Sequence, residues 1–294
     1  MSKKIILWHI AALFCIFVWG NSFVSTKILL KTLDAYEILI YRFIFAYIIL
    51  FLMYPKVKKI KSIKEEMLFM LAGMCGISLY FVFENTSLAY TYASNASFII
   101  SASPILAAIT AHIITADEKI NKSLIYGFFL AITGTFFIMY NGKFFLKLNP
   151  LGDLLAFLSA FVWAFFAVLL KIIGGKHNFI YVMRKVFLYG IITSFPFMFL
   201  FNSEFDVNKL TNSNVIFNLL FLGLIASSMC YVLWNKSINK IGIVVTVNYM
   251  YLVPVVTVIS SNLILKERIT GLMIFGGFLI SLGVFISQKN QKKR

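Results

Sequence analysis

The sequence predicts an all-α integral membrane protein with ten transmembrane helices, arranged as two inverted five-helix repeats around a central cavity. Three observations predict this fold: the composition, the spacing of apolar runs and an internal repeat. Of 294 residues, 61% are hydrophobic and 13% charged, whereas soluble domains are about half apolar and about a quarter charged. A soluble chain of this composition would expose large apolar patches and aggregate. We therefore expect one membrane domain over residues 1–294.

Ten apolar runs have the length of a membrane span. A hydrocarbon core of about 30 Å requires about 20 helical residues. The runs lie at 5–26, 36–54, 67–90, 93–116 and 123–141, and then at 150–171, 180–201, 213–235, 242–265 and 270–287. The first run is too long for the apolar region of a signal peptide, and no small-residue cleavage site follows it. We expect it to be retained as the first span.

The basic residues predict the orientation in the membrane. The chain has 27 Lys and Arg against 11 Asp and Glu, a net charge of +16. Such an excess can indicate nucleic-acid binding, but here the basic residues lie mainly in loops between spans, which indicates topology. With the N-terminus inside, 19 of them face the cytoplasm, 7 face the other side and Arg42 lies within a span. We expect a multi-pass protein of a bacterial cell (cytoplasmic) membrane, with both termini cytoplasmic and no nucleic-acid partner.

The second half of the chain repeats the first at a nearly constant offset. The matching pairs are Phe17–Gly20 with Phe161–Ala164, Asn85–Ser87 with Asn235–Ser237, Pro104 with Pro254, Asp117–Ile120 with Lys266–Ile269, Gly127 with Gly276 and Gly134 with Gly283. Because each half has five spans, the second copy enters the membrane from the opposite side. Inverted repeats, here 5–141 and 150–287, are common in secondary transporters, with the substrate site near the midplane. A duplicated structural bundle without transport is the alternative.

Several of these motifs carry a family resemblance. The stretch W-G-N-S-F-V from Trp19 to Val24, followed by Lys27, the tripeptide Tyr41–Phe43 and the stretch Ala89–Pro104 resemble the EamA family of the drug/metabolite transporter superfamily, as two tandem EamA domains. The resemblance implies a central cavity and secondary transport of small metabolites, in many relatives the export of amino acids or amphipathic compounds. The second half departs from the pattern, since Trp163–Phe166 lacks the polar residues of Trp19–Ser22.

Arg42 and Glu84 lie well inside predicted spans, where a charge is costly and usually functional. Arg42 is in the second span and Glu84 in the third, both in the outer half of the membrane, where they could pair. In the functional interpretation, Arg42 binds a substrate carboxylate while Glu84 binds an amine or carries a coupling proton. In the structural interpretation, they form an ion pair, or Arg42 extends to the interface.

Polar and aromatic side chains on other spans complete the predicted substrate cavity. Aromatic walls suit aromatic or cationic substrates, although most rings in such a chain pack or face lipid. Mid-span prolines remove a backbone donor and kink a helix, so Pro104 and Pro254 are predicted hinges. The matched glycines are predicted to allow close helix packing. The other cavity candidates are Trp19, Asn21, Tyr80, Asn95, Trp163, Tyr231, Asn248 and Tyr251.

The sequence shows no familiar catalytic or cofactor motif. Cys15, Cys75 and Cys230 lie in apolar runs without metal-ligand spacing, and no nucleotide-binding motif is present. We expect no cofactor, no metal and no enzyme activity. The predicted function is gradient-driven transport of a small organic metabolite, an amino acid or related amphipathic compound, by export, with protons as a candidate coupling ion. The alternatives are a membrane-embedded enzyme and a non-transporting partner subunit.

Overall fold

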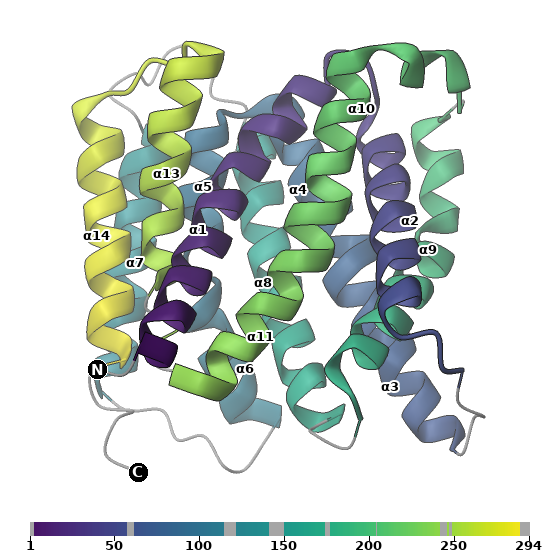
Figure 1. The fold of residues 1–294 in the computed structure, drawn as a ribbon. Coiled ribbons are helices and arrows are strands. Elements are labelled where there is room, and N and C mark those ends of the chain that lie inside the picture. Colours follow the sequence, from purple (N-terminus) through teal and green to yellow (C-terminus); the bar gives the residue numbers. More distant parts are fainter. Residues whose placement is uncertain are drawn as a thin grey trace.

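A computed structural model describes residues 3–57, 62–114, 122–140, 150–173, 177–203, 205–241, 246 and 249–288. Every regular element within these ranges is helical, which confirms the all-α class. The helices run between two ends of the molecule (Figure 1), and α1 begins at the same end at which α14 finishes. We call this the terminal end, and the other the distal end.

The helices of the first half follow the predicted spans. They are α1 (Lys3–Leu29), α2 (Ala35–Met53), α3 (Ile63–Gly73), η1 (Met74–Leu79), α4 (Tyr80–Tyr90), α5 (Ala93–Ile100), α6 (Ser103–Ile114) and α7 (Lys122–Tyr140). A π-helical turn, η1, joins α3 to α4 without a break.

The second half has the same order of elements. They are α8 (Pro150–Ile173), α9 (Phe179–Phe201), η3 (Val207–Thr211), α10 (Ser213–Leu220), η4 (Phe221–Met229), α11 (Cys230–Ile241), η5 (Tyr249–Leu252), α13 (Val253–Ser260), η6 (Ser261–Leu265) and α14 (Gly271–Gln288). The π-helical η4 joins α10 to α11 as η1 joins α3 to α4.

Length and hydropathy support seven of the predicted spans. Seven helices in the described ranges are long and apolar enough to cross a membrane. Three shorter apolar helices, Ile125–Gly134, Val253–Leu265 and Gly271–Gly283, overlap the other three predicted runs. The chain is therefore a multi-pass membrane protein, and the count of ten stays a prediction.

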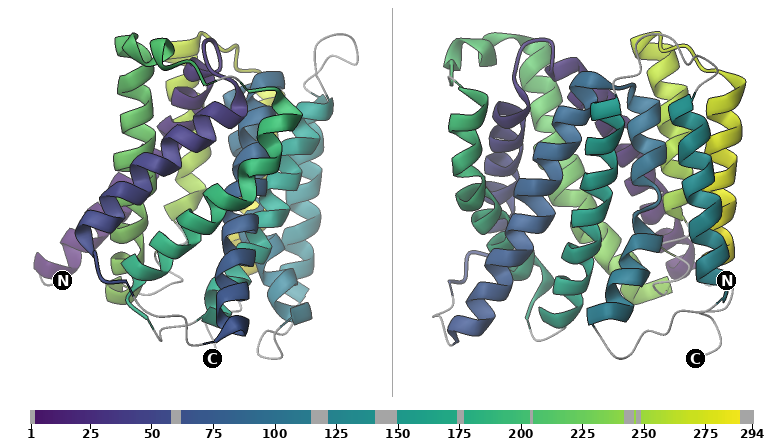
Figure 2. Two further views of the ribbon diagram at one scale, coloured as in Figure 1. Left: turned by 90° about the vertical axis from the view of Figure 1, so that its right-hand side faces the viewer. Right: turned by 180° about the vertical axis from the view of Figure 1, so that it is seen from behind.

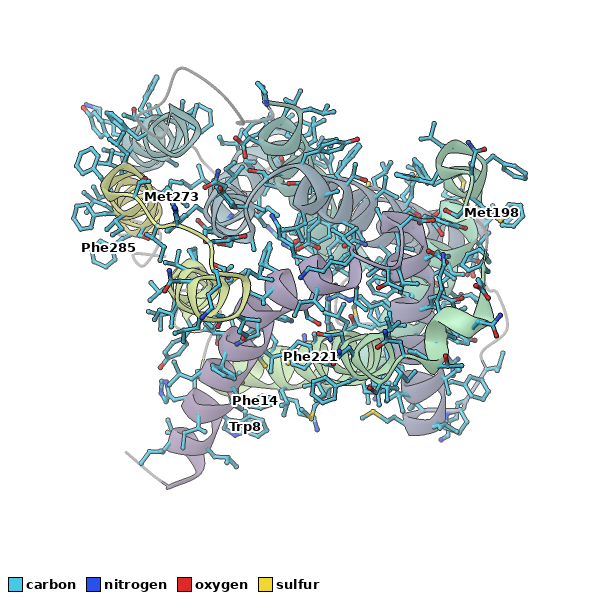
Figure 3. All side chains as sticks on the ribbon, turned by 90° about the horizontal axis from the view of Figure 1, so that it is seen from above. Trp8, Phe14, Met198, Phe221, Met273 and Phe285 are labelled. Atoms are coloured by element: carbon cyan, nitrogen blue, oxygen red, sulfur yellow. The ribbon has the colours of Figure 1, made fainter. Side chains whose placement is uncertain are left out.

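Large apolar side chains cover the outside of the bundle, as lipid contact requires. Phe17 is 60% exposed and Phe285 57% exposed. Seen from above (Figure 3), the labelled Phe14, Met198 and Phe285 lie at the periphery of the helices. In water such a surface would aggregate, whereas in a bilayer it meets hydrocarbon.

The first helix of each half packs against the other half. Helix α1 contacts α10, η4, α11 and α13, while α8 contacts α3, η1, α4, α5 and α6. The halves are thus interlocked, and side chains of α1 and α8 can meet in the interior.

Glycines at matched positions make reciprocal contacts between the halves. A Cβ atom on Gly134 would lie 2.4 Å from the carbonyl oxygen of Gly276, and one on Gly283 would lie 2.5 Å from that of Gly127. Gly276 is the repeat counterpart of Gly127, and Gly283 that of Gly134, so each contact is the mirror of the other across the halves. This confirms the close-packing role predicted for these glycines, and Figure 2 shows α7 and α14 side by side.

A second reciprocal pair lies deeper in the bundle. A Cβ on Gly73 would lie 2.7 Å from the carbonyl oxygen of Val186, and one on Gly223 would lie 3.0 Å from that of Arg42. Gly223 follows Gly73 by 150 residues and Val186 follows Arg42 by 144. These are the offsets of the internal repeat, so both pairs fit a two-fold relation between the halves.

The two predicted hinge prolines occupy the first turns of short helices. Pro104 is the second residue of α6, after the break that separates α6 from α5, and Pro254 is the second residue of α13. Proline is tolerated there because its missing N–H would have no intrahelical partner. The Ile100 carbonyl, four residues before Pro104, accepts a hydrogen bond from Ser103 Oγ at 2.5 Å. Pro104 therefore follows a helix break, whereas Pro254 lies where the 3-10 helix η5 passes directly into α13. Their role as hinges stays a prediction.

The start of α2 is fixed by side chains from both halves. Asp34 and Glu37 form a capping box around the first turn. Lys209 of η3 donates to both carboxylate oxygens of the buried Glu37, at 2.9 and 3.0 Å. This hydrogen bonding raises the pKa of Lys209 above its usual value, so Lys209 stays charged at neutral pH.

The glycine contacts predict which substitutions the bundle tolerates. Gly134→Ala and Gly283→Ala should each lower the unfolding temperature in detergent, because overpacking costs about 1–3 kcal/mol. Gly271→Ala is the matched control, since a Cβ added at Gly271 would have nothing within 4 Å of it. Equal melting temperatures for all three variants would contradict the reciprocal packing.

Candidate functional site

Arg42 is held inside the bundle by a hydrogen bond and an aromatic ring. The side chain lies on α2 and the residue is 3% exposed. Its Nε donates to Ser227 Oγ on η4 at 2.7 Å, and its Cζ lies 4.3 Å from the centre of the Phe81 ring. This is the one hydrogen bond that Arg42 donates within the described part of the chain. The N–H groups of its two terminal nitrogens therefore have no acceptor among the described residues.

Glu84 lies close to Arg42 without pairing with it. Glu84 is 5% exposed on α4, and its Oε2 is buried without a hydrogen-bond partner. Arg42 and Tyr80 are the side chains that interact with its carboxyl group. Among the described residues, however, the ion pairs within 4.0 Å do not include Arg42 with Glu84. An unpaired acceptor therefore faces the same region as a guanidinium with free donors.

Four predicted aromatic residues from four helices meet beside these charges. The Trp163 ring lies 4.9 Å from that of Tyr80 and 6.5 Å from that of Tyr231. Trp19 lies 6.0 Å from Tyr231, and its Nε1 donates to the Ala226 carbonyl. Tyr80 and Tyr231 both lie within electrostatic range of Arg42 and Glu84. We call this group the aromatic-ionic cluster, and its members are Trp19, Arg42, Tyr80, Glu84, Trp163 and Tyr231.

Two of the predicted asparagines, Asn21 and Asn95, make their hydrogen bonds outside the aromatic-ionic cluster. Asn21 was predicted to line the cavity. In the structure its Nδ2 donates to the Phe17 carbonyl of its own helix at 2.8 Å. Short polar side chains in helices often bond the carbonyl four residues earlier. Asn95 is fully buried near the distal end, bonded to Thr91 Oγ1. Asn248 lies outside the described residues. Tyr251 belongs to η5, and its side chain is outside the described part.

A second polar group, at the distal end, was not expected from the sequence. Lys27 of α1 lies 3.6 Å from the Glu267 carboxylate and donates to the Thr91 carbonyl. Thr91 in turn donates to Asp153 of α8. Lys27 and Glu267 fall at or beyond the ends of predicted spans, so burial was not expected. We call this group the Glu267 cluster, and its members are Lys27, Thr91, Ser94, Asn95, Asp153 and Glu267.

Two cavities open away from the aromatic-ionic cluster. One, of about 320 Å³, is lined by Ser62, Lys64 and Ile172 among others. The other, of about 210 Å³, is lined by residues that include Ile28, Thr32 and Asn214. The aromatic rings of the cluster pack against one another, and the central cavity stays a prediction.

Comparisons with known proteins agree with this architecture. A model of the EamA-like transporter family matches residues 6–140 and 150–288. An uncharacterized transporter of Archaeoglobus fulgidus is 27% identical over 287 residues, covering 96% of this chain and 98% of that protein. A protein of Escherichia coli named a probable amino-acid metabolite efflux pump is 27% identical over 179 residues, 59% of this chain and 60% of its own length. A crystal structure at 15% identity has the same fold, with a TM-score of 0.67 over 96% of this chain and 98% of that chain. The chain therefore belongs to the EamA-like transporter family.

Proposed function

We propose that this protein is a secondary transporter that exports a small zwitterionic metabolite, an amino acid or a related amphipathic compound, by alternating access. The observation that carries the proposal is the buried aromatic-ionic cluster, in which Arg42 and Glu84 each retain unused hydrogen-bonding capacity. The name of the Escherichia coli relative supports the substrate class and the direction.

The charges of the cluster match the two ends of an amino acid. A guanidinium presents a planar fork of donors that fits a carboxylate, and Arg42 uses only Nε within the described part of the protein. The free Oε2 of Glu84 can accept from an ammonium group. Unpaired charges in a dry interior cost free energy, so a zwitterion that pairs with both charges would be bound in preference to water or lipid.

The aromatic members of the cluster suit an apolar side chain. Trp19, Tyr80, Trp163 and Tyr231 offer ring faces and edges from α1, α4, α8 and α11. Rings stack on apolar and aromatic groups and attract cations. An amphipathic amino acid would thus meet charges at one end and rings at the other.

The architecture supports alternating access. The cluster combines residues from both halves, and the reciprocal glycine contacts fit two inverted repeats with the predicted boundaries 5–141 and 150–287. In such transporters the halves move against each other around a site between them. We infer that a gradient, an exchange or a proton supplies the energy, with Glu84 as a candidate proton carrier.

Counterflow in proteoliposomes tests the function. We expect wild-type protein to exchange a labelled amino acid from a broad panel, and Arg42→Ala to lose at least about 90% of the rate, since a charge-assisted bond contributes about 1.5–3 kcal/mol. Lys236→Ala is the matched control, because it removes a basic residue from an exposed position on α11. No exchange of any amino acid, amine or nucleoside by the wild type would refute the transporter proposal.

Glu84→Gln separates amine binding from proton transfer. If Glu84 binds the ammonium group, the substitution should raise KM about 10- to 150-fold for an amino acid and much less for the analogue without the amine. Substrate-driven proton flux should then persist at saturating substrate. Loss of that flux with an unchanged KM would instead assign the proton to Glu84.

A double-mutant cycle tests whether Arg42 and Glu84 act together. Arg42→Ala leaves Glu84 as an uncompensated buried charge, so Arg42→Ala with Glu84→Gln should be more stable than the sum of the single effects predicts, by about 0.5–3 kcal/mol. The measurement is the unfolding of all four proteins in detergent. Strictly additive effects would show that the two charges do not sense each other.

A further inference from the structure

A carboxylate of the chain itself occupies the N-terminus of α5. Glu267 Oε1 accepts from the Ala93 backbone N–H at 2.8 Å, and Oε2 accepts from Ser94 N–H at 3.3 Å and Ser94 Oγ at 2.9 Å. Lys27 Nζ lies 3.6 Å from Oε1. Glu267 is 5% exposed. A helix N-terminus attracts anions, and here the anion is in place.

The donors that hold this carboxylate belong to a firmly built frame. Lys27 also donates to the Thr91 carbonyl and lies 5.4 Å from the centre of the Tyr92 ring. Gly152 of α8 packs against Tyr90 and Thr91, and a Cβ added to it would lie only 2.9 Å from Tyr90 Cβ. The α5 end of the site is therefore fixed by α1 and α8, independently of Glu267.

Two unpaired acceptors, one on α5 and one on α8, are joined through Thr91 to the Lys27 that pairs with this carboxylate. Asn95 Nδ2 donates to Thr91 Oγ1 at 3.3 Å, and Thr91 Oγ1 donates to Asp153 Oδ1 at 2.7 Å. This chain of bonds fixes the orientation of the Asn95 amide. Asn95 Oδ1 and Asp153 Oδ2 then remain buried without partners. A group with several N–H donors and a positive charge would satisfy both.

The segment that carries Glu267 bridges the two halves. It joins η6 to α14 as a non-helical connection, and Lys266 adopts a left-handed conformation with φ of 57°. The Glu267 backbone is tied to η6, through Ser261 and Asn262, whereas its side chain reaches α5 of the first half. If the connection between η6 and α14 moves away from α5 at the distal end, this carboxylate leaves while α1 and α8 stay in place, and its donors lose their acceptor. A hydrogen-bond donor left without an acceptor costs free energy, so binding of another carboxylate at these donors would then be favoured.

We propose that Lys27 and the first turn of α5 form a second, distal subsite for an α-amino acid, which Glu267 fills in this structure and the transported solute fills when the distal end opens. The solute carboxylate binds Lys27, Ala93 N–H and Ser94, and its ammonium group binds Asp153 and Asn95. This deepens the proposed function and rests on it for the identity of the solute. Glu267 acts as an internal competitor that closes the path until a carboxylate replaces it.

Chemical rescue of Glu267→Ala tests the subsite without any transport assay. The substitution removes the internal carboxylate and leaves its donors in place. Added sodium acetate should then raise the unfolding temperature of the variant in a saturable way, whereas sodium chloride at equal ionic strength should not. Glycine should act at lower concentrations than acetate, because its ammonium group reaches Asp153. Glu267→Gln, a milder change, serves as the second variant if Glu267→Ala does not fold.

Matched double variants assign each contact. Lys27→Met added to Glu267→Ala should abolish the response to acetate, and Asp153→Asn added to it should remove the advantage of glycine while acetate still acts. A response to acetate no larger than to chloride overturns the subsite. Equal responses to glycine and acetate in Glu267→Ala overturn the ammonium contacts. Rescue by glycine in a protein whose wild type exchanges nothing would keep the subsite and reject the proposed function.

Discussion

The structure depends on one constraint, which is that the hydrocarbon core of a bilayer offers no hydrogen-bond partners. Helices satisfy their backbone groups internally, so an all-helical chain is the expected result for this composition. Charged and polar side chains must find their partners within the bundle. Among the described residues, two polar groups bear on transport, the aromatic-ionic cluster inside the bundle and the Glu267 cluster at the distal end.

The two clusters differ in how completely the protein satisfies them. In the Glu267 cluster a carboxylate of the chain already fills the carboxylate half of the site, while the acceptors for a cation are free. In the aromatic-ionic cluster Arg42 and Glu84 each retain unused hydrogen-bonding groups and do not form an ion pair with each other. In the function we propose, this difference would order the steps of transport, so that a solute held between Arg42 and Glu84 leaves by displacing an internal carboxylate. The tight contacts between α7 and α14 lie apart from both clusters.

The sequence alone allowed prediction of the charged residues that lie within apolar runs. Arg42 and Glu84 were predicted because a charge within an apolar run has no solvent, and Trp163 and Tyr231 were predicted as aromatic side chains that suit a cavity wall. The Glu267 cluster could not be predicted because Lys27 and Glu267 resemble charges in loops. Only the folded chain brings the connection that carries Lys266 and Glu267 against α5. Asn21 stays a predicted cavity residue, and a sequence cannot show that its amide bonds its own helix. The helix break before Pro104 and the 3-10 helix before Pro254 depend on backbone geometry that hydropathy does not contain.

The central claim, a zwitterion bound between Arg42 and Glu84 against aromatic rings, is tested most directly by intrinsic fluorescence. Trp19 and Trp163 lie in the cluster, so a bound solute should change their emission. We expect a saturable change on titration with an amphipathic amino acid, and none with its amide or its N-acetyl derivative, which each lack one of the two charges. The same saturable response to all three compounds would show that the charges of the cluster do not recognise the solute.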